Sequence, residues 1–189
     1  MSERARRNRG VLLYSGLVLE RIDTTRLVGT RICEADWPDF LELFHDARVM
    51  ATLGGPQTDE WIRSFFDHNV DHWKRHGYGL WMFRERDGER FAGRAGIRRC
   101  LVDARDEVEL GYTVRFDRWG RGYATEMSAG ILKLAFGEDG LDQVVAFTLH
   151  TNLPSRRVME KLGFVYEKDI VHKDLPHVMY RLGNPGRPL

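Results

Sequence analysis

One segment, Trp119–Glu126 (WGRGYATE), constrains the fold of this 189-residue chain more than any other. The run Val108–Val114 before it reads as a strand, and apolar residues after it recur at helical spacing, so its glycines lie at a strand-to-helix turn. The first N–H groups of a helix lack internal partners, and the helix dipole is positive there. Without a Cβ at Gly120 and Gly122, a pyrophosphate could approach the main chain closely. The turn therefore predicts a phosphate-binding site.

Two common nucleotide-binding motifs are excluded by the residues of this turn. A dinucleotide-binding turn requires a third glycine, where this chain has Thr125. A P-loop requires Lys and then Ser or Thr after its last glycine, where this chain has Tyr123 and Ala124. The ligand is therefore another phosphate compound, unless the glycines serve turn geometry alone.

Length and charge indicate a single domain without a large basic surface. A chain with 42% hydrophobic residues can bury one core, and 29 basic against 28 acidic residues give a net charge of +1. This balance argues against nucleic acid as the main partner. Arginines crowd the start, so residues 1–16 are predicted to be a flexible basic arm, which leaves a ribosomal contact open. Residues 17–183 are the predicted domain, and residues 184–189 are a polar tail.

Cysteine usage and apolar runs bear on the cellular location. Cys33 and Cys100 are too isolated for a zinc site or a disulfide framework, so we expect no metal and a reducing, cytoplasmic location. The apolar stretch Val11–Leu19 is too short to span a membrane, and no small-residue cleavage site follows it. We therefore expect no membrane contact, and both a monomer and a homodimer stay open.

Hydrophobic periodicity gives the expected order of elements, which is βαα, βββ, α, β, α, ββ. This order predicts an α/β (α+β mixed) fold, with a mixed, largely antiparallel sheet of six to seven strands and helices on both faces. The predicted strands are 26–33, 80–84, 90–99, 107–115, 143–149, 164–169 and 177–182, and the predicted helices begin near 36, 58, 122 and 154.

Three segments in order resemble the GNAT superfamily of acyl-CoA-dependent N-acyltransferases. WGRGYATE is similar to the family's pyrophosphate loop, and Trp119 at its first position is typical of a branch that resembles ribosomal-protein alanine N-acetyltransferases. Residues 152–164 (NLPSRRVMEKLGF) resemble that branch's NxxSxxVxEKLGF signature, and residues 24–40 resemble its opening pattern. The resemblance covers about Leu17 to Leu182 and implies a GNAT-like sheet with two strands splayed at the acyl-CoA site.

The resemblance implies acetyl-CoA as the acyl donor. Main-chain amides of the turn would bind the pyrophosphate, and the edge of the strand ending at Val114 would pair with the pantetheine amides. Asn152 would cap a helix, contact the pantetheine arm, or do both. Arg156 and Arg157 could reach the 3′-phosphate, although a solvated helix face explains them equally well. The predicted cofactor-binding residues are Thr113, Val114, Arg115, Trp119, Gly120, Arg121, Gly122, Tyr123, Ala124, Thr125, Asn152, Ser155 and Arg156.

Ser155 and Glu109 are the predicted catalytic residues. Many family members place a Tyr one helical turn beyond Ser155 to protonate the leaving thiolate, but this chain has Met159 there. Ser155 is therefore expected to hydrogen-bond the CoA sulfur, unless it only satisfies backbone in the first helical turn. Glu109 is the expected base, because its sequence neighbours are partly apolar and would favour a raised pKa. The alternative for Glu109 is a salt-bridged strand carboxylate, and His150 and His172 are rival bases.

The expected reaction is direct acetyl transfer to a primary amine, because neither cysteine lies in the donor-binding segments. At pH 7, deprotonation of a protein α-amine, with a reference pKa of about 7.7 to 8.0, costs about 1 kcal/mol, against roughly 4.6 for a lysine. An α-amine thus needs only a modest base. The acceptor stays open between a peptide N-terminus, such as that of a ribosomal protein, and a small-molecule amine. A non-catalytic CoA-binding sensor or scaffold is the alternative function.

Overall fold

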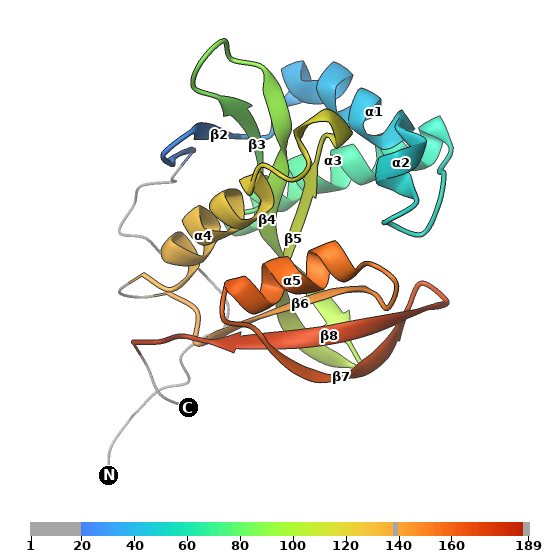
Figure 1. Cartoon of the computed structure of the whole chain (residues 1–189), viewed down its shortest axis with the longest axis vertical. Helices are drawn as coiled ribbons and strands as arrows, with labels where there is room; N and C mark the ends of the chain where they lie inside the picture. The colour runs from blue at the N-terminus through green and yellow to red at the C-terminus, as the bar shows by residue number, and fades with distance from the viewer. Residues whose placement is uncertain (1–19, 138–139, 187–189) are drawn as a thin grey trace.

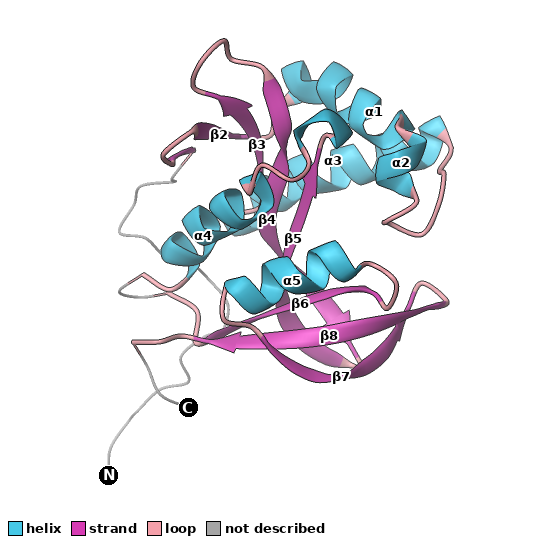
Figure 2. Cartoon of the chain, viewed as in Figure 1, coloured by secondary structure: helices cyan, strands magenta, loops and turns pink. Residues whose placement is uncertain are grey.

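The computed structural model describes residues 20–137 and 140–186, so the predicted basic arm (1–16) and positions 187–189 of the predicted tail lie outside the described residues. Its strands form one sheet with the order β1-β2-β3-β4-β5-β6-β8-β7, and helices cover it (Figure 2). The strands are β1 (Arg21–Asp23), β2 (Leu27–Arg31), β3 (Leu80–Glu85), β4 (Phe91–Val102), β5 (Arg105–Val114), β6 (Gln143–Leu149), β7 (Val165–His172) and β8 (Leu175–Gly183). The helices are α1 (Trp37–His45), α2 (Ala47–Met50), α3 (Asp59–His76), α4 (Tyr123–Ala135) and α5 (Leu153–Lys161), with short 3-10 turns at Glu34–Asp36 and Phe116–Arg118.

The sheet opens between β5 and β6, its one parallel pair among the described strands. These two strands pair only at Glu109 and Val145, whereas every other neighbouring pair is antiparallel and longer. Beyond Glu109, β5 keeps β4 on one side and diverges from β6 on the other. Figure 1 shows the half that carries β2–β5 spread away from the half that carries β6–β8, with α5 beside the opening. The predicted mixed, largely antiparallel sheet with splayed strands is confirmed.

Helices lie on both faces of the sheet, as predicted. Successive side chains of a strand point to opposite faces. On β4, Arg94 contacts Phe44 of α1 and Phe65 of α3, so this face of β4 and β5 is covered by α1 and α3. On β5, Tyr112 points the other way and bonds Ser155 of α5, which contacts α4. Each strand residue near the opening therefore faces either α1 and α3 or α4 and α5.

The apolar face of each helix explains where it packs. In α3, Thr58 caps the first turn by accepting a hydrogen bond from the Trp61 N–H, and Gly77 ends the helix in a left-handed conformation with φ of +72°. Between these caps, Ile62, Phe66 and Trp73 are buried. Burial of such side chains contributes about 1.5 to 3 kcal/mol each. The largest fully buried side chains of the core are Trp81, Phe40, Phe66 and Phe83.

The sheet has eight strands, one more than the upper end of the prediction, and two hairpins are tighter than expected. The short strand β1 was not predicted. Asp103 and Ala104 have φ of +48° and +60°, so a two-residue turn joins β4 to β5, although the predicted strands leave residues 100–106 between them. Lys173 and Asp174 form the same kind of turn between β7 and β8, with φ of +50° and +60°. Both hairpins thus extend further than hydrophobic alternation indicates.

The first residue of the predicted C-terminal tail packs against the fold. Asn184 is buried, and its side-chain amide donates to the carbonyl oxygens of Phe136 and Leu141. These bonds tie the end of β8 to the end of α4.

Candidate functional site

A cavity of about 1070 Å³ fills the opening between β5 and β6. Residues from both faces of β5 line it, including Glu109 on the α1 and α3 side and Tyr112 on the α5 side. The cavity therefore runs through the gap in the sheet. Eleven predicted site residues line it, namely Glu109, Thr113, Val114, Trp119, Gly120, Gly122, Tyr123, Ala124, Thr125, Asn152 and Ser155.

The cavity has two ends, which are named here by their residues. The turn end is formed by residues 119, 120 and 122–125 with Asn152. The hairpin end is formed by Arg94 and Arg98 of β4, Glu109 of β5 and Lys173 of the β7–β8 hairpin.

The glycines of the turn end are required by backbone conformation. Gly120 and Gly122 have φ of +75° and +77°, a region that costs other residues about 1 to 2 kcal/mol. A Cβ at Gly120 would meet no atom within 4 Å, so the main chain faces open space there. The Trp119 Nε1–H donates to the carbonyl oxygen of Val114 at 2.8 Å and ties the turn to the end of β5. Open main chain at the start of α4 fits an anionic phosphate.

A buried carboxylate anchors this turn from below. Glu85 of β3 accepts a hydrogen bond from the Tyr123 hydroxyl at 2.9 Å and lies 3.1 Å from the Arg118 guanidinium. Burial alone would raise the pKa of Glu85, but the Tyr123 bond and the charges of Arg118 and Arg90 outweigh it and lower the pKa. Glu85 therefore stays charged and fixes the start of α4.

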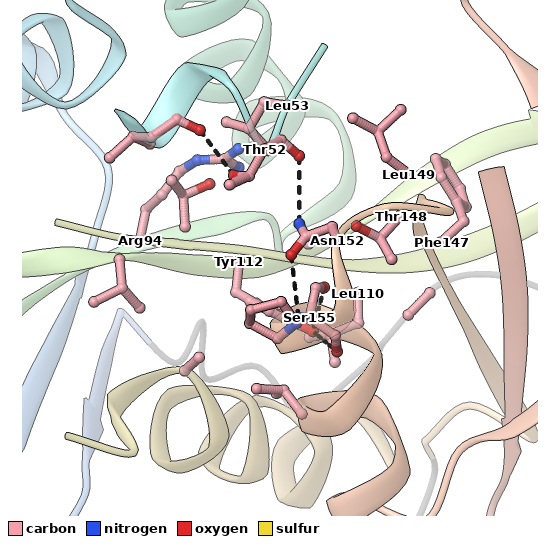
Figure 3. A pocket seen from close by; sticks show the side chains of 18 of the residues that line it. Thr52, Leu53, Arg94, Leu110, Tyr112, Phe147, Thr148, Leu149, Asn152 and Ser155 are labelled. Atoms are coloured by element: carbon pink, nitrogen blue, oxygen red, sulfur yellow. Dashed lines mark hydrogen bonds between the residues drawn. The ribbon is translucent and has the colours of Figure 1, made fainter. Parts of the chain in front are cut away.

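Three hydrogen bonds join α5 to both sides of the opening (Figure 3). The Asn152 carboxamide oxygen accepts from the Ser155 N–H at 3.2 Å, and its nitrogen donates to the Thr52 carbonyl at 3.3 Å. The helix-cap alternative for Asn152 is thus confirmed, and the same side chain holds the turn after α2. The Ser155 hydroxyl lies 2.9 Å from the Tyr112 hydroxyl, and Tyr112 also donates to the Ser155 carbonyl. Burial raises the pKa of Tyr112 to about 12.

Glu109 lies in different surroundings from those that its sequence neighbours suggested. It is 5% exposed, and its Oε2 accepts a hydrogen bond from the Arg98 Nε–H at 2.8 Å. Arg98 is its cross-strand partner on β4, whereas Val108 and Leu110 point to the opposite face of the strand. The prediction that apolar neighbours surround Glu109 was therefore wrong. The alternative, a salt-bridged strand carboxylate, describes its contact with Arg98. Among the described residues no donor bonds Glu109 Oε1, so one oxygen remains available inside the cavity.

Three predicted cofactor-binding residues do not line the cavity. Arg115 pairs with Glu42, and Arg121 extends toward Glu85 at 3.8 Å. The Arg156 Nε–H donates to the Tyr180 hydroxyl at 3.1 Å, while the neighbouring Arg157 does line the cavity. Of the rival bases, His172 lines the cavity and His150 lies outside it.

A protein-family model described as an acetyltransferase (GNAT) domain matches residues 26–165, which contain the turn end and all of α5. The chain belongs to the GNAT acetyltransferase family. It is therefore an acyltransferase of a family that uses acetyl-CoA as donor. The open glycine turn at the start of α4 and the unpaired edge of β5 fit that donor.

Relatives and solved structures agree with this GNAT assignment. An uncharacterized Bacillus subtilis protein, YkkB, is 30% identical over 138 residues, which are 73% of this chain and 80% of the relative. The crystal structure of an Agrobacterium tumefaciens acetyltransferase superposes with a TM-score of 0.77 at 25% identity, covering 94% of this chain and 99% of that one. RimL, a ribosomal L7/L12 alpha-N-protein acetyltransferase in complex with coenzyme A, gives a TM-score of 0.72 at 16% identity over 87% of this chain and 98% of that one. The last likeness shows the fold alone.

The GNAT site contains residues that sequence reasoning missed. Tyr112 is not among the predicted site residues, although its hydroxyl meets Ser155 across the opening. Arg94 and Lys173 also line the cavity and belong to no motif. Alternation along β4 places Arg94 and Arg98 on one face of that strand, which the sequence does show, but only the strand register reveals that this is the face of Glu109. Lys173 enters only through the tight β7–β8 turn, which alternation does not reveal.

The described part of the chain contains neither a metal-binding cluster nor a membrane-spanning helix. In residues 20–137 and 140–186, no group of three or more His, Cys, Asp or Glu side chains could hold a metal ion. Within the same ranges, no helix is both long and apolar enough to cross a membrane.

Proposed function

We propose that this GNAT acetyltransferase transfers the acetyl group of acetyl-CoA directly to a primary amine, which is a protein N-terminal α-amine or a small-molecule amine. The observation that carries the proposal is the single cavity through the sheet. It combines open main chain that fits a phosphate at the turn end with a hydroxyl pair at its middle and a carboxylate at the hairpin end. RimL acts on a ribosomal protein's α-amine, and peptide N-termini are therefore included among the proposed acceptors.

The donor would bind along the opening of the sheet. Main-chain N–H groups of residues 120–124 would hold the pyrophosphate, because the start of α4 presents unpaired donors and positive dipole charge. Arg118 and Arg157 line the same end and add positive charge. The free edge of β5 from Leu110 to Val114 would pair with the pantetheine amides, although Trp119 already bonds the Val114 carbonyl. Asn152 lies where it would contact the pantetheine arm.

Proton transfers would be divided between the two sides of the opening. The neutral amine attacks the thioester carbonyl carbon, the C–S bond breaks, and the electron pair leaves with sulfur. Glu109 Oε1 takes the amine proton, directly or through water. The Ser155 hydroxyl gives a proton to the thiolate and takes one from Tyr112, which solvent reprotonates after the products leave. Burial raises the pKa of Tyr112 to about 12, so Tyr112 is the neutral phenol at the start of each cycle. Tyr112 thus supplies the phenol for thiolate protonation that the chain lacks at position 159, where it has Met159.

Neither cysteine is placed to form an acetyl-enzyme. Cys33 is exposed, Cys100 is half-buried, and neither lines the cavity. Burial raises the pKa of Cys100 to about 12, so little nucleophilic thiolate forms at neutral pH. Direct attack by the acceptor amine is therefore the route that the cavity supports best.

The proposal is tested by mixing the purified protein with acetyl-CoA and a panel of N-terminal peptides, polyamines and aminoglycosides while CoA thiol release is followed. We expect acceptor-dependent release with at least one amine and about a hundredfold loss of kcat in Ser155→Ala, with CoA binding retained. If none of the acceptors in the panel causes CoA release, the proposal is contradicted. A stoichiometric acetyl-enzyme formed without acceptor would contradict direct transfer.

A further inference from the structure

The hairpin end contains a buried guanidinium without a polar partner. Arg94 is 9% exposed and lines the cavity, and its guanidinium lies over the rings of Phe44 and Phe65, 5.4 Å from each ring centroid. Figure 3 shows this side chain rising from β4 toward Thr52. Within residues 20–137 and 140–186, Arg94 makes no hydrogen bond or ion pair, and its Nε is buried without an acceptor.

An unpaired buried cation is costly, so its presence calls for a ligand. Other interior arginines of this protein have carboxylate partners, such as Arg98 with Glu109 and Arg181 with Glu107. The cation–π contacts position Arg94, but they leave its buried Nε–H without an acceptor. Thr113, its cross-strand neighbour, also has a buried hydroxyl with no partner among the described residues. Two idle donors thus lie side by side in the cavity wall.

The charge around Arg94 selects an anion. Arg94, Arg98 and Lys173 each place their charged group within 6.0 Å of the centroid of the Phe65 ring. Glu109 is the one carboxylate that lines the cavity among the described residues, and Arg98 already bonds it. Burial lowers the pKa of Arg94 to about 9, so it remains a cation at neutral pH. The hairpin end therefore carries positive charge that no described side chain balances.

We propose that the acceptor amine also carries a carboxylate and that Arg94 binds this carboxylate. The inference rests on the proposed function, because it names the acceptor of that same cavity. The planar guanidinium fork matches a carboxylate in a bidentate pair, and Thr113 can donate a further bond. With the carboxylate at Arg94, the amine of a short zwitterion faces the oppositely charged Glu109. The carboxylate is that of a free amino acid or of an acidic side chain near a peptide N-terminus.

Matched acceptor pairs test this inference. Each pair has an acid and its neutral amide: alanine with alaninamide, glutamate with glutamine, and peptides that begin Ala-Glu with peptides that begin Ala-Gln. Calorimetric titration into the protein saturated with CoA measures binding without turnover. We expect at least one acid to bind about tenfold or more tightly than its amide, since a charged hydrogen-bonded pair is lost. The pair that shows the largest ratio identifies the source of the carboxylate. Equal affinity within every pair would overturn the inference.

Arg94→Met removes the charge and keeps a long apolar side chain against the Phe44 and Phe65 rings. We expect the acid-to-amide preference to fall to about twofold, while the affinity for CoA stays within about twofold of wild type. Arg63→Met is the matched control, because Arg63 likewise lies over an aromatic ring, that of Phe66 at 5.2 Å from its centroid, but is paired and lies outside this cavity. That variant should keep the full preference. A preference unchanged in Arg94→Met, or lost equally in Arg63→Met, would overturn the inference.

Thermal unfolding separates a ligand-binding arginine from a structural one. Without ligand, Arg94→Met should melt at or above the wild-type temperature, because an unpaired buried charge is removed. A clear drop in melting temperature would assign Arg94 a structural role and count against the inference. Arg94→Gln provides the same binding test if the Met variant does not fold. If no acceptor is acetylated at all, the proposed function fails, yet the titrations with CoA-saturated protein still decide this inference.

Discussion

The turn end and the hairpin end of the cavity are built on opposite principles. The turn end presents main chain, held by two left-handed glycines and by the buried Glu85 contacts beneath. The hairpin end presents charged side chains from β4, β5 and the β7–β8 hairpin, which are far apart in sequence. Every amino acid has a main-chain N–H except proline, so the turn end depends on conformation, whereas the hairpin end depends on which side chains are present. The turn end thus suits the acyl donor that the whole family shares, and the hairpin end suits an acceptor that is particular to this protein.

The largest expected effect lies at the hairpin end. Glu109→Gln should lower kcat about a thousandfold, because the amide cannot accept the amine proton, while CoA affinity changes little. Glu107→Gln is the control, since Glu107 is also a buried β5 carboxylate paired with an arginine, Arg181, but lies outside the cavity. Steady-state kinetics compare the two. Equal losses of kcat would mean that Glu109 serves only as an ion-pair partner. The hairpin end would then contain no proposed general base.

The next effect lies where the ends meet. Tyr112→Phe should lower kcat by about 10- to 100-fold and leave both KM values nearly unchanged, because it removes the proton supply to Ser155. Tyr180→Phe removes a comparable buried hydroxyl that bonds Arg156 and Glu160 outside the cavity. This control should retain wild-type kcat. If Tyr112→Phe turns over normally, the hydroxyl pair is structural.

At the turn end the expected effect is on binding. Gly122→Ala should weaken CoA affinity about tenfold, since a residue with a Cβ resists φ of +77° and shifts the amides. Gly88 has a similar φ of +85° in the β3–β4 loop, away from the cavity. In thermal unfolding, Gly88→Ala should be destabilised about as much as Gly122→Ala. In calorimetry, Gly88→Ala should bind CoA with wild-type affinity. CoA binding that is unaffected in Gly122→Ala would contradict a main-chain phosphate site.

The smallest effect compares two helix caps. Asn152→Ala and Thr58→Ala each remove a side chain that caps a helix, α5 and α3, and each should cost about 1 kcal/mol in free energy of unfolding. Only Asn152 also joins the two sides of the opening through Thr52. Chemical denaturation should show similar losses, and CoA affinity should fall severalfold in the Asn152 variant alone. Equal CoA affinities in the two variants would remove Asn152 from the turn end.

The same contrast explains how far sequence could predict this molecule. Local signals sufficed for the glycine turn, the start of α3 near residue 58, and the order of elements, because each depends on residues close in sequence. The environment of the Glu109 carboxylate was predicted wrongly, because its contacts depend on the cross-strand partner and not on adjacent residues. Lys173 reaches the cavity only through a two-residue turn of non-glycine residues, which gives little signal in composition. The hairpin end is therefore visible only after strand register is known.

A crystal structure of the protein with bound CoA tests the central claim most directly. The account predicts pyrophosphate oxygens within hydrogen-bond distance of the main-chain N–H groups of residues 120–124. It also predicts the CoA sulfur at the Ser155 and Tyr112 hydroxyls, with the space around Arg94 left open. Pyrophosphate bound at Arg94 and Lys173, or a sulfur remote from Ser155, would contradict the division of the cavity into a donor end and an acceptor end.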